Sequence, residues 1–509
     1  MQAASPSLAQ STSRLEDAPM TRSLLLLLCL SCAPQPARPT VQPSPLESQP
    51  AFRPEPPEWG GFRGNNSTGI AVNAVLPDVL DTETNLLWRT EIPKGYSSPT
   101  ICGERVFITG ADKEHLFTLC LDRNNGEVQW KASLPYDGKR PGANSPAAPS
   151  PVTDGERVYS LFHHAGLITY DMAGHELWRK DLGIINIPHG LATSPLVHEG
   201  LLIQMIDQDT GSFLVGLDAA TGEERWRTER NNVTHSYSTP TLYTPTEGNP
   251  QIIVSGSFQI AGYSPRDGSK LWWVDGGAWQ TKAVPVIDGD LCIVNSFMLS
   301  TSEMGIPKFS GTFEELLELR DENDNGFLDR EEWDHELVQQ IWFILDLNGD
   351  SLLDSADWDY ALATTRALGG LFAIQLGGTG NVTDTHVRWF ADDRRGLPDI
   401  PSPLVLDGTI YMIKRGGIFT ALEAATGRVL QRGRVGESDA YYASPVAAGK
   451  RILLASQSGQ LLLLDADEGW EEISAGSVDE EVWSTPAVAG QHVVVRSQSA
   501  LYCFGPDPG

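Results

Sequence analysis

A short motif recurs along the chain where apolar segments begin. A small or hydroxyl residue followed by proline precedes an apolar stretch, a turn and a second apolar stretch, as in SPVTDGERVYSLF at 150–162. Apolar runs bounded by such turns are typical of short antiparallel strands. The prolines are separated by 52, 44, 45, 45, 118, 42 and 41 residues. The eight dipeptides are Ser98-Pro99, Ser150-Pro151, Ser194-Pro195, Thr239-Pro240, Val284-Pro285, Ser402-Pro403, Ser444-Pro445 and Thr485-Pro486.

A third apolar stretch in each unit ends in an acidic turn that leads to a tryptophan, most clearly in GLDAATGEERWR at 216–227. The tryptophan marks the outer strand of each unit, and Gln431 replaces it in one of them. The pattern therefore predicts eight four-stranded units. The tryptophans are Trp88, Trp130, Trp178, Trp226, Trp273 and Trp389.

Repeated units of this length, none of which can bury its own faces, are typical of a β-propeller. A β-sandwich with accidental spacing is the alternative, but a sandwich would not repeat one motif eight times. The chain begins with an outer-strand motif around Trp88 and ends on a third strand at Cys503, so the N-terminal strand should complete the last blade. The predicted fold class is all-β, an eight-bladed propeller of four-stranded antiparallel blades that occupies 58–300 and 367–509.

The step of 118 residues from Pro285 to Pro403 is far longer than its neighbours and contains DENDNGFLDREEW at 321–333. This stretch matches the EF-hand loop, in which oxygen ligands at alternate positions wrap a calcium ion and a glycine, here Gly326, permits the sharp turn. A solvated acidic loop is the alternative. The predicted ligands of this first loop are Asp321, Asn323, Asn325, the Phe327 carbonyl, Asp329 and Glu332.

A second loop, DLNGDSLLDSAD at 346–357, departs twice from the pattern. Ser351 replaces the turn glycine and Asp357 is shorter than glutamate, so this site should bind calcium more weakly. One shared helix of about 20 Å should join the two loops. The predicted ligands of the second loop are Asp346, Asn348, Asp350, the Leu352 carbonyl, Asp354 and Asp357.

We therefore expect 301–366 to form a small α-helical EF-hand pair, the insert, between the second and third strands of blade five. In an antiparallel meander this turn lies on the same face as the link into each first strand. The insert should thus lie beside those links. Its shared helix should dock on the propeller or a partner, unless calcium merely rigidifies a long loop. The docking residues would be Trp333, Leu337, Ile341 and Trp342.

Several aromatic and basic residues lie on those links, at or just upstream of the third position before each repeat proline. They are candidates for a ligand-binding face around the channel mouth. Alternatively, they wedge between blades. These mouth residues are Tyr96, His189, His235, Tyr237, Trp279, Lys282, Tyr442 and Trp483.

Charge narrows the choice of partner. The 509 residues carry a formal charge of −29, which excludes a basic surface for nucleic acid and favours cations. Residues 311–360 hold 16 acidic residues and two arginines, so much of the acidity belongs to the insert. We expect Ca²⁺ as the cofactor.

The N-terminal 1–32 resembles a secretion signal, and Met20 is a candidate start. Leu24–Leu30 is too short to span a bilayer. Ser31-Cys32 resembles a bacterial lipoprotein processing site, which predicts lipidation at Cys32; simple cleavage and release is the alternative. Residues 33–57 contain nine prolines and should form an extended tether. The protein is therefore expected outside the cytoplasm, in a bacterial periplasm or on a cell surface, attached to the membrane through a lipid anchor only.

The remaining cysteines are Cys102, Cys120, Cys292 and Cys503. Cys102 and Cys120 belong to the first and third strands of one blade, about 10 Å apart and beyond the reach of a disulfide. We expect buried free thiols.

The LDAATGxxxW-type repeat resembles the PQQ-like propellers, which include quinoprotein dehydrogenases and BamB-like assembly lipoproteins. WGGFRGNNSTGIA at 59–71 is similar to the opening motif of an exported bacterial branch. The resemblance implies the fold but not one function. In the dehydrogenases an adjacent cysteine pair and an aspartate base serve the quinone. No two cysteines are adjacent here, and no matching aspartate constellation is found, so PQQ is not expected as a cofactor.

Together these observations favour an exported calcium-binding scaffold with a protein or extracellular polymer as partner. No catalytic residue is predicted. The alternative is a PQQ-dependent oxidoreductase of the quinoprotein dehydrogenase type.

Overall fold

The computed structural model describes residues 56–296, 308–333, 336–466 and 469–506. The chain divides into two units, Met1–Arg53 and Pro54–Gly509. The predicted signal peptide and lipidation site at Cys32, with most of the predicted tether, lie outside the described residues. No described helix is long and apolar enough to cross a membrane.

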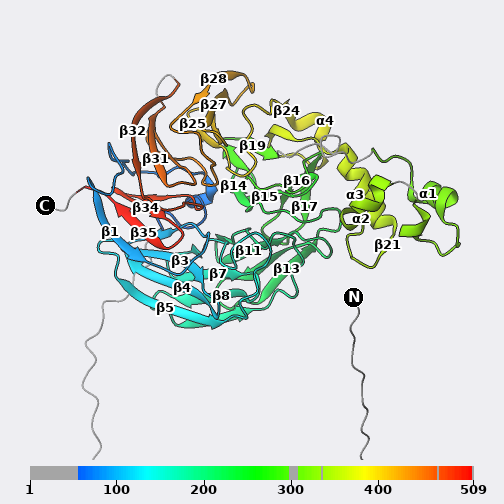
Figure 1. The fold of residues 1–509 in the computed structure, drawn as a ribbon, viewed down its shortest axis with the longest axis horizontal. Coiled ribbons are helices and arrows are strands. Elements are labelled where there is room, and N and C mark those ends of the chain that lie inside the picture. Colours follow the sequence, from blue (N-terminus) through cyan, green and yellow to red (C-terminus); the bar gives the residue numbers. More distant parts are fainter. Residues whose placement is uncertain (1–55, 297–307, 334–335, 467–468, 507–509) are drawn as a thin grey trace, which may run out of the picture. The chain divides into compact units, whose positions relative to one another are not determined.

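In the described part of the second unit, eight sheets, each built on four antiparallel strands, are arranged in a ring (Figure 1). Each sheet is one blade, and the predicted eight-bladed propeller is confirmed. Blades one to four contain β2 (Thr100–Cys102), β3 (Arg105–Ala111), β4 (His115–Asp122) and β5 (Val128–Pro135); β6 (Val152–Thr153), β7 (Arg157–Phe162), β8 (Gly166–Asp171) and β9 (Glu176–Lys180); β10 (Leu196–His198), β11 (Leu201–Ile206), β12 (Phe213–Asp218) and β13 (Glu224–Glu229); and β14 (Thr241–Tyr243), β15 (Gln251–Ser255), β16 (Gln259–Tyr263) and β17 (Lys270–Asp275).

The remaining blades follow the same order, although blade five is interrupted and blade eight borrows its outer strand from the N-terminal side. Blades five to eight contain β18 (Val286–Asp288), β19 (Leu291–Ser296), β22 (Gly370–Gln375) and β24 (Val387–Ala391); β25 (Leu404–Leu406), β26 (Thr409–Lys414), β27 (Ile418–Glu423) and β28 (Val429–Arg434); β29 (Val446–Ala448), β30 (Arg451–Ala455), β31 (Gln460–Asp465) and β32 (Glu471–Ser477); and β33 (Ala487–Ala489), β34 (His492–Arg496), β35 (Ala500–Phe504) and β1 (Leu86–Glu91).

The ring closes as the sequence predicts. Strand β1 pairs antiparallel with β35, with Trp88 opposite Cys503. Arg496 of blade eight is fully buried and donates to the Ser97 and Thr109 carbonyl oxygens of blade one at 3.1 and 2.7 Å. Burial lowers its pKa to about 9. The first and last blades are therefore joined by both a strand and a buried cation.

The hydroxyl-proline repeat forms a belt of hydrogen bonds around the ring. In seven of the eight steps, the backbone N–H of the residue before proline donates to the side-chain hydroxyl of its counterpart in the next blade, at 2.8–3.1 Å. At the remaining step Val284 has no hydroxyl, and Ser238 Oγ donates to the Ala283 carbonyl oxygen instead, at 2.9 Å. The repeat thus links blades to one another.

The outer-strand tryptophans also connect neighbouring blades. Their indole N–H groups donate to backbone carbonyls of the next blade, for example Trp226 to Pro265 at 2.9 Å. In blade four, however, the counterpart is Trp272 and not the predicted Trp273. Trp272 faces Gly262 as Trp226 faces Gly216. Its indole donates to the side chain of Gln251 in the same blade. At this place β23 (Gly380–Asn381), from the segment between β22 and β24, pairs in parallel with β17 and makes blade four five-stranded.

The opening motif at 59–71, which includes the short helix η1 (Asn65–Ser67), touches the first strands of several blades. Trp59 bridges to Ile101 of blade one, and Ile70 bridges to Ala447 of blade seven. Buried Arg63 donates to the Pro403 carbonyl oxygen at 2.6 Å. The motif therefore supports the ring by tying distant blades together.

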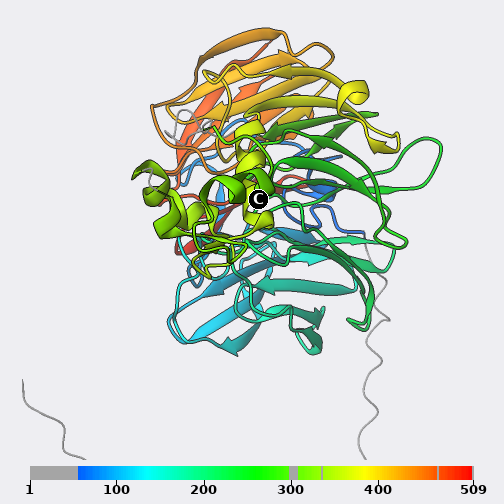
Figure 2. The same ribbon diagram turned by 90° about the vertical axis from the view of Figure 1, so that its right-hand side faces the viewer.

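Between β19 and β22 the chain forms helices and a two-stranded sheet, which lie together next to β16 and β17 (Figures 1 and 2). These elements have their own core, which includes Leu328, Trp333, Trp342 and Trp358. The four cysteines outside the N-terminal region are buried and free, as predicted. The elements are α1 (Phe313–Arg320), β20 (Leu328–Asp329), the 3-10 helix η2 (Arg330–Glu332), α2 (Glu336–Leu345), β21 (Leu352–Leu353) and α3 (Ser355–Arg366), while α4 (Thr383–His386) precedes β24.

Candidate functional site

The first loop follows α1 and folds around its own side-chain oxygens. Asp321 accepts the backbone N–H groups of Asn325 and Gly326 at 3.1 and 2.9 Å. The Glu332 carboxylate reaches back to the N–H groups of Glu322 and Asn323 with one oxygen and to that of Asp329 with the other. Gly326 has a φ of 82°, which is the left-handed turn that the motif requires. The predicted oxygens therefore belong to one folded loop.

The second loop repeats this arrangement despite its two departures. Asp346 accepts the N–H groups of Asp350 and Ser351 at 3.2 and 2.9 Å. The shorter Asp357 still spans the loop, since its two oxygens accept the N–H groups of Leu347 and Asp354 at 2.9 and 3.1 Å. Ser351 adopts a φ of 72°. The sequence correctly predicts a left-handed residue at this position.

The two loops are joined by β20 and β21, in which Leu328 faces Leu353. One helix, α2, connects them as predicted, and its described part spans ten residues, Glu336–Leu345. Within the described ranges, no group of three or more His, Cys, Asp or Glu side chains is gathered closely enough to hold a metal ion. The predicted donors also include Asn323, Asn325 and backbone carbonyls, which are neutral oxygen ligands.

Asp357 differs from the other loop carboxylates in its burial. Its side chain belongs to a residue only 3% exposed. Burial is the main cause that raises its pKa, to about 6, and the charges of Asp354 and Asp346 act in the same direction. Calcium requires the ionised form, so an ion in the second loop would compete with protons near that pH.

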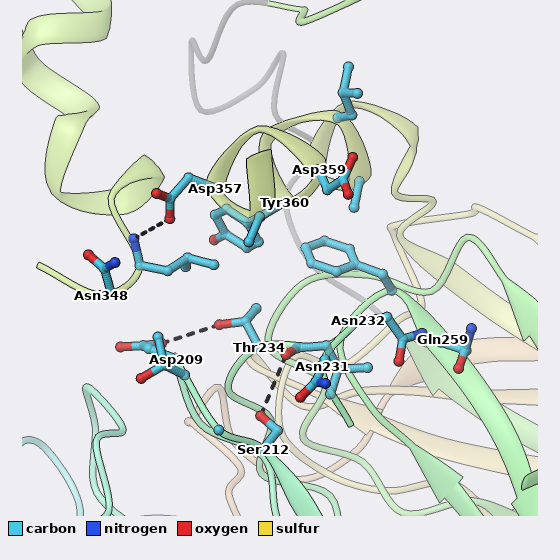
Figure 3. Close-up of a pocket in the computed structure, with 18 of the residues that line it drawn as sticks. Asp209, Ser212, Asn231, Asn232, Thr234, Gln259, Asn348, Asp357, Asp359 and Tyr360 are labelled. Carbon is cyan, nitrogen blue, oxygen red and sulfur yellow. Dashed lines mark hydrogen bonds between the residues drawn. The ribbon is translucent and has the colours of Figure 1, made fainter. Parts of the chain in front are cut away.

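A cleft of about 970 Å³ separates the second loop and α3 from blades three and four (Figure 3). Asn348, Asp354 and Asp357 of the second loop line one wall. The opposite wall comes from the turns between the second and third strands of both blades and from the links that follow them, with Asp209, Asn231, Thr234, Phe258 and Asp275 among its residues. Residues of the predicted calcium loop and of the propeller therefore line the same cleft.

Beside this cleft, His235 lies between two polar partners. Its Nδ1 hydrogen-bonds the Asp209 carboxylate, and its Nε2 is 2.7 Å from the Gln280 amide. The ring of Trp279 lies 5.6 Å from that of His235 and 6.3 Å from that of Tyr360 on α3. The insert thus touches an inter-blade link, and the predicted side of emergence is confirmed.

The docking prediction, in contrast, was wrong for two of its residues. Trp333 and Trp342 are 6% and 4% exposed and belong to the insert's own core, against which Ile341 also packs. The side chain of Leu337 lies outside the described residues. Tyr360, which packs edge-on against Phe258 at 5.6 Å, makes the contact with the propeller instead.

The mouth residues form two groups and an ion pair. Trp483 stacks between Tyr96 and Tyr442, with ring centroids at 5.0 and 4.1 Å. Tyr237 lies 5.9 Å from His189 and 6.1 Å from His235. Tyr237 and His235 are buried, whereas His189 is exposed. Lys282 pairs with Asp399 at 2.7 Å.

Sequence reasoning missed Asp209, Gln280 and Tyr360. Asp209 and Gln280 lie on different blades from one another, at 26 and 45 residues from His235, and no motif spacing joins them. Tyr360 lies just beyond the second loop and carries no signal other than its aromatic ring at a helix position.

Comparison with known proteins agrees with the fold. The family described as outer membrane protein assembly factor BamB matches residues 117–296 and 379–506, more than half of the chain. The gap between these segments contains the helical insert. No curated protein sequence matches the chain.

Solved structures with the same fold include proteins of different function. BamB from Moraxella catarrhalis has a TM-score of 0.50 and 11% identity, covering 83% of this chain and 99% of its own. A europium-containing methanol dehydrogenase has a TM-score of 0.56 and 11% identity, covering 89% and 98%. Quinohemoprotein alcohol dehydrogenase ADHIIG from Pseudomonas putida HK5 has a TM-score of 0.54 and 13% identity, covering 89% and 82%. At these identities the likeness concerns the fold alone, whereas the sequence match is specific: the chain belongs to the family of the outer membrane protein assembly factor BamB.

Proposed function

We propose that this chain is an exported, calcium-binding scaffold whose helical insert is an EF-hand pair. One observation carries the proposal: Asn348, Asp354 and Asp357 of the second loop also line the cleft against blades three and four. An ion held by these residues would act directly on the wall of a binding cleft. The partner would be a protein or an extracellular polymer.

The chemistry of the loops supports calcium as the ion. Oxygen donors at alternating positions, a left-handed turn residue and a twelfth-position carboxylate that spans the loop are what a hard cation needs. The first loop would hold it with Asp321, Asn323, Asn325, Phe327, Asp329 and Glu332, and the second with Asp346, Asn348, Asp350, Leu352, Asp354 and Asp357. Bound calcium would neutralise the carboxylates of each loop.

Calcium titration of the full chain by calorimetry tests the proposal. We expect two binding events, with dissociation constants on the order of 10⁻⁴–10⁻³ M for extracytoplasmic sites. The double variant Glu332→Gln/Asp357→Asn should lose both events. Glu331→Gln/Glu336→Gln, which removes two exposed charges from the same insert, should keep them. Equal calcium binding by the two double variants would refute the EF-hand assignment.

Export and anchoring are proposed from Cys32 and the leucine run before it. A lipid-anchored protein should appear in the membrane fraction and be released by detergent but not by salt, which weakens only electrostatic association. Cys32→Ser should make it soluble, and an unchanged distribution would contradict the anchor.

A quinone-dependent oxidoreductase is the second candidate, because dehydrogenases share the fold. The residues of this chain do not fit the quinone site that the resemblance implies. Cys102, Cys120, Cys292 and Cys503 are buried in β2, β4, β19 and β35, and none is adjacent to another. Quinone absorbance retained by the purified protein after addition of PQQ would favour this candidate over the scaffold.

A further inference from the structure

The cleft between the insert and the propeller has strongly unbalanced charge. Among the described residues that line it, Arg366 is the single basic residue, against six carboxylates. Such a concentration of one sign attracts ligands of the other sign. The carboxylates are Asp209, Glu229, Asp275, Asp354, Asp357 and Asp359.

A buried hydroxyl gives independent support for a ligand. Tyr360 lines the cleft and is 6% exposed, yet its hydroxyl has no hydrogen-bond partner in the described part of the chain. Figure 3 shows its ring projecting from α3 into the space above Asp209 and Thr234. Burial, followed by the charge of Asp209, raises the pKa of this hydroxyl well above its usual value. Buried polar groups are nearly always paired, so a neutral hydroxyl here calls for a partner in the cleft.

The carboxylates differ in their freedom to meet a ligand. Asp275 accepts the side-chain amides of Gln259 and Asn381 at 2.9 and 2.8 Å, and Asp209 is bound to His235. The side chains of Glu229 and Asp359 are in exposed residues on opposite walls. Neither of them forms a hydrogen bond or ion pair with the residues that the structure describes. These two charges are therefore available.

We propose that the cleft binds an alkylammonium or guanidinium group, carried either by a free polyamine or by a lysine or arginine side chain of a partner. Glu229 and Asp359 supply charge from the two walls, and the Tyr360 hydroxyl accepts a hydrogen bond from the cation. The rings of Tyr360 and Phe258 also line the cleft, and aromatic faces attract such cations. A volume of about 970 Å³ accommodates several residues of a peptide or an extended polyamine.

The cation site deepens the proposed function, and only the expected effect of calcium on that site rests on it. An ion in the second loop would neutralise Asp354 and Asp357, which line the same cleft. Calcium should therefore weaken binding of the organic cation. Binding measured in the presence of a chelator does not depend on the calcium assignment.

The test is calorimetric titration of the full chain in EDTA with spermidine, acetylated pentalysine amide and acetylated pentaglutamate amide. We expect the two cationic probes to bind and pentaglutamate not to bind. Tighter binding of spermidine would identify a free polyamine as the ligand, and tighter binding of pentalysine would identify a side chain of a protein partner. Glu229→Gln/Asp359→Asn should raise the dissociation constant about tenfold, since two exposed ion pairs are lost. Tyr360→Phe should raise it about threefold through loss of one hydrogen bond.

The control is Glu127→Gln/Asp384→Asn, which removes two exposed carboxylates outside the cleft and should leave the dissociation constant unchanged. Equal affinities of the cleft and control variants, or equal binding of pentaglutamate and pentalysine, would overturn the cation site. If calcium does not change the affinity for the organic cation, only the predicted effect of calcium on the cleft is overturned. If the protein binds the organic cation but not calcium, the calcium assignment is overturned.

Discussion

The two loops of the insert have the same hydrogen-bond pattern but different surroundings. In the first, Glu332 is half-buried, and the following Trp333 and α2 pack into the insert's own core. In the second, Asp357 is almost fully buried and α3 places Tyr360 against Phe258 and Trp279 of the propeller. Loop chemistry and connection to the propeller are therefore separate properties. The first loop matches the EF-hand pattern better, and the second has the closer contact with the propeller.

The largest expected effect comes from breaking that connection. Tyr360→Ala should lower the free energy of undocking α3 by about 3 kcal/mol, because a buried ring is lost and a cavity is left. Hydrogen exchange of 355–366 in the full chain measures this loss, with 313–320 as an internal reference. Tyr360→Phe keeps the ring and removes only the unpartnered hydroxyl, so its protection should equal or exceed that of the original protein. If α3 exchanges equally in the alanine variant, the contact does not hold the insert to the propeller.

Single substitutions of the twelfth residues should separate the loops. Glu332→Gln should weaken the stronger calcium event about 100-fold. Loss of a direct ligand should lower metal affinity more than loss of a group that only hydrogen-bonds a ligand. It should leave calcium-dependent hydrogen exchange at 229–234, on the propeller wall of the cleft, unchanged. Asp357→Asn should instead abolish the response at 229–234 and preserve the stronger event. If hydrogen exchange at 229–234 responds to calcium in the same way in both variants, the second loop is not the one that transmits calcium binding to the propeller.

The fold was predictable because neighbouring blades repeat the same hydrogen bond between their hydroxyl-proline motifs. Each hydroxyl-proline pair provides a backbone donor and a side-chain acceptor for its neighbours, so the repeat in the sequence is also the belt in the ring. The error at Trp273 arose where Trp272 and Trp273 are adjacent, because spacing alone does not reveal which one faces Gly262.

The cleft could not be predicted for a different reason. An apolar helix face indicates burial but not against which surface, so the tryptophans of the insert could equally have served its own core or the propeller. Trp333 and Trp342 took the first role, and Tyr360 took the second. The Asp209–His235 pair joins a turn of blade three to a link, and only the ring brings these segments together.

Acidification should increase the stability of the calcium-free insert and decrease the calcium affinity of the second loop. The pKa of Asp357 is raised from 3.8 to about 6, so between these values the folded, calcium-free insert binds more protons than the unfolded chain. Its stability therefore increases as pH falls through this window and decreases as pH rises. Calcium needs the ionised carboxylate, so affinity at the second loop should fall about tenfold between pH 7 and pH 5. Paired calorimetry and hydrogen exchange at the two pH values measure both changes. Asp357→Asn, which removes the titrating carboxylate and the second calcium event with it, should abolish the pH dependence of stability. A calcium affinity of the second loop that is constant with pH would contradict the raised pKa of Asp357.

The smallest expected effect concerns the turn residue. Ser351 and Gly326 adopt similar left-handed conformations, with φ of 72° and 82°, and a side chain at Gly326 would meet no atom within 4 Å. The difference between the loops at this position is therefore one of backbone strain and not of space. Ser351→Gly should stabilise the second loop by about 1 kcal/mol, and Gly326→Ser should destabilise the first by a similar amount. Hydrogen exchange of each loop in the calcium-free full chain measures both effects, and the double variant should show them as independent changes in the two loops. If Ser351→Gly has no effect while Gly326→Ser is destabilising, the serine is not strained, and any weaker calcium affinity of the second loop must be attributed to Asp357 alone.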